Sequence, residues 1–228
     1  MRFQSSALTL AIASTLFCPC LAQNPQPTVY TDPTTGICFD VWDIPGDSKT
    51  GGMAFGMALP STALKTDATE FIGYLNCKER QGWCGIALGG SMTDSLLFVA
   101  YADGDVVRTS LRFTHKYAAP GVYTGNATVA EIAHEVTETG ISFIFHCQDC
   151  LHWSQDGGSG RASTGSSMLD LGYAQSVQDP GNPSCAREAP LMLHDAQGTW
   201  TAMLDESATS DSYDQWRALA NPTVPDNC

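Results

Sequence analysis

Basic residues are scarce in this chain. Eleven lysines and arginines stand against 24 aspartates and glutamates, which gives a formal net charge of −13 at pH 7. A field of that sign repels nucleic acids and anionic lipid surfaces, so it excludes binding modes that depend on neutralising phosphates. We therefore expect neither a nucleic acid nor a membrane as a partner. An acidic medium, which neutralises some of the carboxylates, would suit such a chain.

Long hydrophobic runs are also missing after the N-terminal segment, so no later stretch is expected to span a bilayer. The N-terminal segment itself combines Arg2, an apolar run over residues 7–17 and a small residue, Ala22, before a polar one. This is the pattern of a secretory signal peptide. We expect residues 1–22 to be removed and residues 23–228 to form one secreted, monomeric domain, long enough for a proper core.

Several catalytic motifs are absent. The chain has no Gly-x-Ser-x-Gly, no Gly-x-Gly-x-x-Gly and no P-loop. The spacing of its glutamates does not define a hydrolase pair. These absences exclude the common hydrolase and nucleotide-binding signatures.

Alternating apolar and small or polar residues recur in short segments that are separated by turn residues. This pattern predicts an antiparallel β-sandwich. The expected strands are residues 37–44, 53–59, 71–76, 83–88, 95–101, 106–113, 141–146, 168–174 and 199–204. Residues 129–137 fit either a strand edge or a short helix. Residues 155–167, rich in Gly and Ser, predict a flexible surface loop, and residues 211–220 predict a short terminal helix.

The nine cysteines suit a secreted, disulfide-bonded chain. Cys18 and Cys20 fall within the expected signal, so an odd number is left and at least one cysteine is free or intermolecular. Cys77 and Cys84 flank a short polar loop that a bridge between them would close. The sequence does not choose a pairing among Cys38, Cys185 and Cys228.

One segment, WCGIALGGSM over residues 83–92, combines an expected strand with a glycine turn. Gly89 and Gly90 allow a tight bend and the close approach of a bulky group. Met92 stands at this turn, and its thioether suits a soft metal such as haem iron. The alternative is that Met92 fills a core gap, as most methionines do. Met57 is a second candidate, but its place in a regular strand favours packing.

Other segments accompany this one in a fixed order. They are DPTTG over residues 32–36, TEFIG over 69–73, residues 83–92, residues 112–125, CQDC over 147–150 with Trp153, and Asp179 with Pro180. Together they resemble the haem b cytochrome domain of fungal cellobiose dehydrogenases and related secreted iron-reductase-type cytochrome domains. The resemblance covers roughly residues 31–194. Cys84 departs from it, because the family usually has an aliphatic residue there.

The resemblance implies an immunoglobulin-like sandwich that binds haem b non-covalently at one end, between an axial methionine and an axial histidine. Met92 matches the methionine. The histidine follows the Asp179 loop at about the family's interval, which implies His194, and Asp195 is expected to orient its imidazole. Tyr117 matches a tyrosine near a haem propionate.

The other histidines are weaker candidates. His146 lies in an expected strand and could face either side, whereas His115 and His134 are expected to be exposed. His152 follows Cys150 by two positions, but covalent haem attachment requires Cys-x-x-Cys-His. A zinc site from Cys147, Cys150 and His152 is the alternative there. The resemblance instead implies a local disulfide between these two cysteines.

The function that the resemblance implies is one-electron transfer rather than turnover of a substrate. A flavin- or quinone-dependent sugar dehydrogenase would be the donor. Lytic polysaccharide monooxygenases, ferric complexes or quinones would be the acceptors, so ferric reductase activity and a role in lignocellulose degradation are possible. Asn126 begins a glycosylation sequon.

Two other hypotheses stay open at this point. The first is a carbohydrate-binding sandwich without haem, in which exposed Trp42, Trp153 or Trp200 stacks on sugar rings. The second is a haem-based ligand-binding or sensor sandwich.

Overall fold

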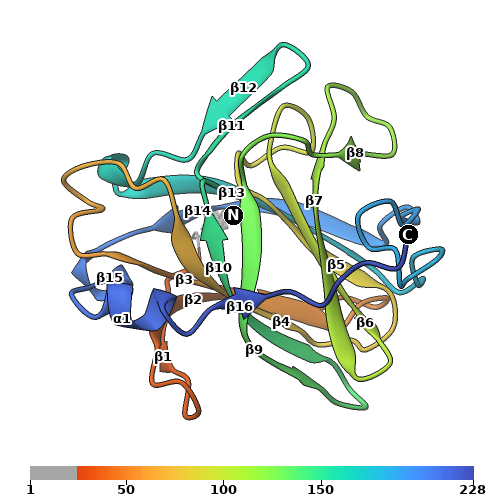
Figure 1. The fold of residues 1–228 in the computed structure, drawn as a ribbon, viewed down its shortest axis with the longest axis horizontal. Helices are drawn as coiled ribbons and strands as arrows, with labels where there is room; N and C mark the ends of the chain where they lie inside the picture. Colours follow the sequence, from red (N-terminus) through yellow and green to blue (C-terminus); the bar gives the residue numbers. More distant parts are fainter. Residues whose placement is uncertain (1–24) are drawn as a thin grey trace, which may run out of the picture.

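The computed structural model describes residues 25–228, so the expected signal at residues 1–22 lies outside the described residues. Two β-sheets pack face to face, as Figure 1 shows. The first sheet has the order β1 (Thr28–Thr31), β2 (Cys38–Pro45), β3 (Gly52–Pro60), β4 (Phe71–Cys77), β10 (Ile141–Gln148), β9 (Thr128–Val136) and β16 (Asn221–Pro222), with β15 (Thr209–Ser210) beside β3.

The second sheet has the order β14 (Ala196–Met203), β13 (Met168–Ser176), β5 (Trp83–Ala87), β6 (Leu97–Asp103), β7 (Val106–Phe113) and β8 (Gly121–Val122). Neighbouring strands in it are antiparallel. The remaining elements are the hairpin β11 (His152–Gln155) and β12 (Gly158–Arg161), η1 (Thr164–Ser166), η2 (Glu206–Ala208) and α1 (Tyr213–Arg217). None of the helices within residues 25–228 is long and apolar enough to cross a membrane.

The core lies between the two sheets. Phe55 and Phe145 from the first sheet are fully buried, as is Phe98 from the second. The rings of Phe98 and Phe145 stack with centroids 4.3 Å apart, and Phe55 meets Trp200 of the second sheet edge-on at 6.4 Å. Alternate residues of each strand therefore meet in one apolar layer, which is the packing of a β-sandwich. The predicted all-β antiparallel sandwich with a short helix near the C-terminus is confirmed.

Three disulfides form within the described residues. Cys77–Cys84 links β4 of the first sheet to β5 of the second, and Cys147–Cys150 closes a local turn. Both pairings were expected. Cys185–Cys228 settles the choice that the sequence left open, and Cys38 is the free cysteine.

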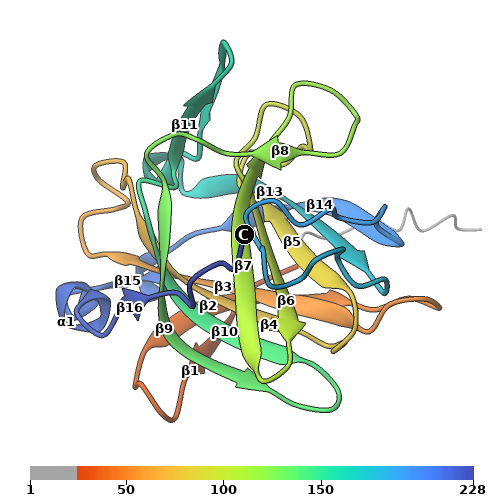
Figure 2. The ribbon, with the colours of Figure 1, turned by 45° about the vertical axis from the view of Figure 1, so that its right-hand side comes forward.

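The segment expected to be a flexible loop, residues 155–167, is partly ordered instead. Asp156 and Gly157 both have positive φ, at 52° and 87°, and join β11 to β12 with Gln155 opposite Gly158. A two-residue Asp-Gly turn with this geometry suits the twist of a hairpin. Figures 1 and 2 show the β11–β12 hairpin projecting from the sandwich. Residues 129–137, which the sequence left undecided, lie largely in strand β9.

The three tryptophans proposed to stack on sugars are buried. Trp42 is 0% exposed, Trp153 4% and Trp200 6%. Each side chain packs in the apolar core, so none presents a ring face to a polysaccharide. The carbohydrate-binding hypothesis depended on exposed tryptophan side chains, and that expectation is wrong.

Asp40 of β2 is a buried carboxylic acid. It is 0% exposed; Ser207 Oγ donates to its Oδ1 at 2.7 Å, and its Oδ2 has no hydrogen-bond partner among residues 25–228. Burial raises the pKa of Asp40 above its ordinary value of 3.8; the Ser207 hydrogen bond opposes this and the charge of Asp205 adds to it. The folded state therefore binds this proton more tightly than the unfolded state.

We predict that Asp40→Asn changes how stability depends on pH. Because the folded-state pKa is raised, stability from Asp40 is present below pH 3.8 and is lost as pH rises through the folded pKa. The variant lacks this loss, so its stability relative to the parent should increase between pH 4 and pH 7 in denaturant unfolding. Asp43→Asn, which alters an exposed ion pair on the same strand, is the control and should change stability by less than about 1 kcal/mol. Parallel pH profiles for Asp40→Asn and the parent would contradict the assignment.

Candidate functional site

A cavity of about 860 Å³ lies on the outer face of the six-stranded sheet, the face turned away from the core. Strand β5 shows the division: Cys84 belongs to the core and is not among the lining residues, whereas Gly85 and Ala87 line the cavity. A volume of this size is that of a cofactor or drug-sized ligand site.

The floor of the cavity is made of small residues. Gly85 and Ala87 on β5 stand beside Ala174 and Gly172 on β13, in register as two cross-strand pairs. Larger side chains at these four positions would fill the space above the sheet. Around this floor the lining is largely apolar, with contributions from Leu97, Phe98, Val99, Pro120 and Leu191.

One wall of the cavity is the turn that contains Met92. Gly90 has φ +78°, a conformation that strains other residues, and a Cβ there would lie only 3.2 Å from Cβ of Asp170. The turn is fixed at both ends: Gly89 N–H donates to Ser95 Oγ at 2.7 Å, and Trp153 Nε1 donates to Asp94 O at 2.9 Å. Met92 is thus held on an ordered turn that lines the cavity.

The opposite wall is the segment that contains His194. Trp83 Nε1 donates to the carbonyl of Met192 at 3.2 Å, and Ser176 Oγ donates to that of Leu193 at 3.2 Å. Asp195 Oδ2 accepts from Ser176 Oγ at 3.2 Å and from the N–H of Val177 at 3.1 Å. Its own N–H bonds to the carbonyl of Gln175 at 2.8 Å. Asp195 therefore fixes the backbone of this wall, and the expectation that it orients the imidazole is wrong.

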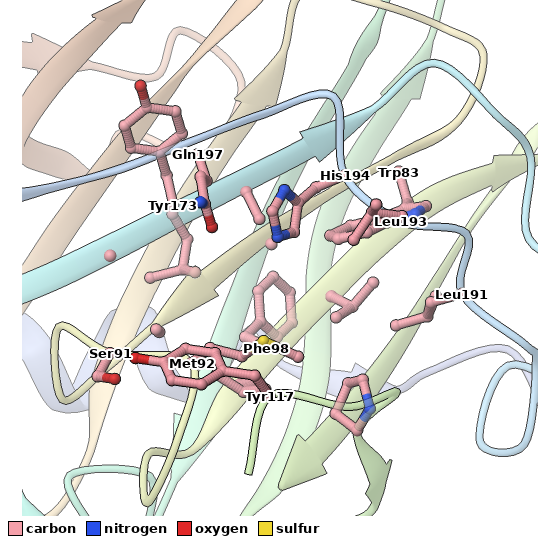
Figure 3. Close-up of a pocket in the computed structure, with 18 of the residues that line it drawn as sticks. Trp83, Ser91, Met92, Phe98, Tyr117, Tyr173, Leu191, Leu193, His194 and Gln197 are labelled. Atoms are coloured by element: carbon pink, nitrogen blue, oxygen red, sulfur yellow. The ribbon is translucent and has the colours of Figure 1, made fainter. Parts of the chain in front are cut away.

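Met92 and His194 lie at opposite ends of β5. Met92 lies in the turn that comes after Ala87, the last residue of the strand, whereas His194 precedes β14 at the end where Gln175 pairs with Ala196. A five-residue strand spans roughly 13 Å at about 3.3 Å per residue. Figure 3 shows the two side chains on opposite sides of the cavity. The imidazole of His194 has no hydrogen-bond or ion-pair partner among residues 25–228.

Tyr117 stands at the mouth of the same cavity. It lies in the connection between β7 and β8, is 85% exposed and is labelled among the lining residues in Figure 3. The structure thus brings together all three residues that the resemblance singled out: Met92, His194 and Tyr117 line one cavity.

The other histidines lie elsewhere, and three of them already have carboxylate partners. Nε2 of His146, which is buried, lies 3.0 Å from Glu70, while exposed His115 and His134 pair with carboxylates at 2.6 Å. His152 is exposed on the β11–β12 hairpin. The zinc site proposed there is wrong, since no group of three or more metal-ligating side chains occurs in the described part of the chain. Met57, the rival thioether, is fully buried in the core.

Sequence reasoning missed several contributors to the site. The small-residue floor, the Trp83 hydrogen bond and the role of Ser176 were not anticipated. Alternate small residues on β5 and β13 are a usable signal for the floor, because an ordinary packed strand would place larger side chains there. The hydrogen bonds to loop carbonyls leave no trace in the sequence.

A β-sandwich with a thioether and an unpartnered imidazole facing one cavity is the arrangement expected of a haem-binding cytochrome. The family model for the cytochrome domain of cellobiose dehydrogenase matches residues 30–215, and the chain belongs to this family.

Two solved structures of cytochrome domains are similar to this chain in fold and sequence. The cytochrome domain of cellobiose dehydrogenase from Myriococcum thermophilum is 48% identical, with a TM-score of 0.86 over 89% of this chain and 100% of that one. The cytochrome b domain of pyranose dehydrogenase from Coprinopsis cinerea is 25% identical, with a TM-score of 0.67 over 87% of this chain and 98% of that one.

A curated relative is the pyrroloquinoline quinone-dependent pyranose dehydrogenase of Coprinopsis cinerea. It is 30% identical over 162 residues, which make up 70% of this chain but only 22% of the relative. The chain therefore corresponds to about a fifth of that protein.

Membership of a cytochrome domain family implies haem, and the cavity fits such a group. It has the volume for a cofactor, an apolar lining and a small-residue floor. Its two facing donors, Met92 and His194, are of the types that ligate haem iron in cytochromes.

We predict that Ala174→Phe prevents haem binding without unfolding the protein. Ala174 faces the cavity rather than the core, so a larger side chain would occupy the ligand's space. The variant should keep the parent's far-ultraviolet circular dichroism but lose the Soret band. Thr201→Phe, on the outer face of β14 but outside the cavity lining, should keep both. A full Soret band in Ala174→Phe would show that the cavity does not hold the haem.

Proposed function

We propose that this chain is a one-electron carrier that binds haem b non-covalently, with Met92 and His194 as its axial ligands. The observation that carries the proposal is the placement of a thioether and an unpartnered imidazole on opposite walls of one apolar cavity. Bound haem supplies a one-electron iron couple. Met92 and His194 would hold its iron as the two protein donors, which would leave no open position for an external ligand.

The anchors of the two walls suit electron transfer. Gly89, Asp94 and Asp195 are all hydrogen-bonded to the body of the sandwich, so the two donors are attached to a rigid frame. A frame that holds both donors in place limits how far they move when the charge at the site changes. A methionine–histidine pair also raises the reduction potential relative to harder ligand pairs.

We predict that replacing either ligand changes the spectrum in its own way. The parent should show sharp α and β bands on reduction and should not bind carbon monoxide. Met92→Ala should open one axial position, so the reduced variant should bind carbon monoxide and lose the sharp bands. His194→Ala should lose most of its haem. Ser91→Ala, which keeps both donors, is the control; an unchanged Met92→Ala spectrum would refute the ligand assignment.

Non-covalent attachment is supported by the cysteines. Cys147 and Cys150 are joined to each other and are buried in the core cluster, and neither lines the cavity. Cys38, the free cysteine, lies on β2 of the other sheet. No thiol among the described residues is therefore placed to bond a haem vinyl group in this cavity.

We predict that the haem can be extracted intact. Acidified butanone should transfer the pigment to the organic phase as unmodified protohaem, identified by its mass and by its pyridine haemochrome spectrum. A covalently attached haem, as in c-type cytochromes, would stay with the protein in the aqueous phase. Pigment that stays with the polypeptide would contradict the proposal.

The electron donor in this proposal is a sugar dehydrogenase with a flavin or quinone cofactor. Relatives named as cellobiose and pyranose dehydrogenases support this class. The acceptors would be lytic polysaccharide monooxygenases, ferric complexes or quinones. Rapid mixing of the oxidised protein with such a dehydrogenase and its sugar should produce the reduced bands, and adding an acceptor should remove them. No reduction by any dehydrogenase of this class would contradict the donor assignment.

We further propose that residues 23–228 act as a secreted domain after removal of residues 1–22, and that the domain is monomeric. The disulfides support an oxidising compartment. Asn126 is exposed, so it is accessible for glycosylation.

A further inference from the structure

Arg112 is an unusual residue beside the cavity. It is only 4% exposed and lies on β7, where it pairs in register with Leu97 of β6. Leu97 lines the cavity, so Arg112 is one strand further from it on the same sheet.

The guanidinium of Arg112 joins both sides of the site. Nη2 donates to the carbonyls of Ala186 and Ala189 at 2.8 and 2.9 Å, in the segment that leads into the His194 wall. Nη1 donates to the carbonyl of Pro120 at 3.5 Å, in the segment that contains Tyr117. Ala186 and Ala189 belong to the same buried apolar cluster as Trp83, whose indole N–H donates to the carbonyl of Met192. A single side chain therefore connects two separate segments that line the cavity.

The charge of Arg112 has no carboxylate partner at ion-pair distance among residues 25–228. Asp226 and Glu188 act on it only at longer range, and burial lowers its pKa. A guanidinium stays charged even so. Arg108 provides a contrast: it is also buried on β7, but its Nε is paired with Asp103 at 3.0 Å.

We propose that Arg112 is a positioning residue of this site, which holds the His194 and Tyr117 segments together and whose uncompensated charge favours the reduced form of the bound haem. The second part rests on the proposed function. Reduction adds one negative charge to the site, and a buried cation attracts that charge strongly because the surrounding dielectric is low. The midpoint potential should therefore be higher with the charge than without it.

The test compares Arg112→Lys and Arg112→Gln with Arg108→Gln as the matched control. Lysine keeps the charge but not the planar fork that reaches several carbonyls, whereas glutamine removes the charge. Both Arg112 variants should transfer haem to an apoglobin acceptor about tenfold faster or more, the effect of losing hydrogen bonds from a charged donor. Only Arg112→Gln should lower the midpoint potential in a spectroelectrochemical titration.

The control should match the parent in both measurements. Removing Arg108 breaks its hydrogen bond to the carbonyl of Pro225 in the C-terminal segment. That segment stays attached through Cys185–Cys228 and through the hydrogen bonds that the amides of Ala186 and Arg187 donate to the Asp226 carboxylate. If haem transfer is unchanged in both Arg112 variants, the positioning role is wrong. If Arg112→Gln has the parent's midpoint potential, or Arg112→Lys falls as low, the charge effect is wrong.

Hydrogen exchange separates this inference from the proposed function. Both Arg112 variants should exchange faster than the parent and the control in peptides covering residues 186–194 and 117–120, whether or not haem is bound. A parent protein without haem would end the electron-carrier proposal but leave the positioning role testable by this measurement. Unchanged exchange in these peptides would overturn the positioning role even if the haem spectrum is as proposed.

Discussion

The separation between the Met92 turn and the His194 segment is the constraint on which the whole site depends. It is set by β5, because the two donors stand at opposite ends of that strand. Hydrogen bonds accepted by Ser95 and donated by Trp153 and Ser176 attach both walls to strands or to residues beside them. The sandwich thus acts as a frame, and the rigidity of its sheets keeps two distant parts of the chain at a fixed distance.

The two faces of the six-stranded sheet have different roles: one packs in the core, and the other lines the cavity. Large aromatic and aliphatic side chains fill the space between the sheets, whereas Gly85, Ala87, Gly172 and Ala174 leave room on the other face. The cavity can therefore be shaped without opening the core. A site on an outer face also lies near the surface, where Tyr117 is exposed, and a redox partner needs such access for short-range electron exchange.

The sequence predicted the fold well because strands with one buried face show their period of two. It placed Met92 at a turn on local grounds, whereas His194 followed only from resemblance, since nothing in its own surroundings marks it as facing a cavity. Tertiary packing explains the failures. The carbohydrate-binding alternative required exposed tryptophans, but all three are buried in the core, and Asp195 bonds to Ser176 rather than to the imidazole. Asp156–Gly157 is a typical hairpin turn sequence, but the glycines and serines around it favoured the prediction of a flexible loop.

The most direct test of the central claim is the coordination of iron in the purified, oxidised protein. X-ray absorption at the iron edge counts sulfur and nitrogen neighbours separately. The account predicts a single sulfur neighbour together with the porphyrin nitrogens and one further nitrogen, with the sulfur signal lost in Met92→Ala. An iron site without sulfur, or a protein without iron, would contradict it.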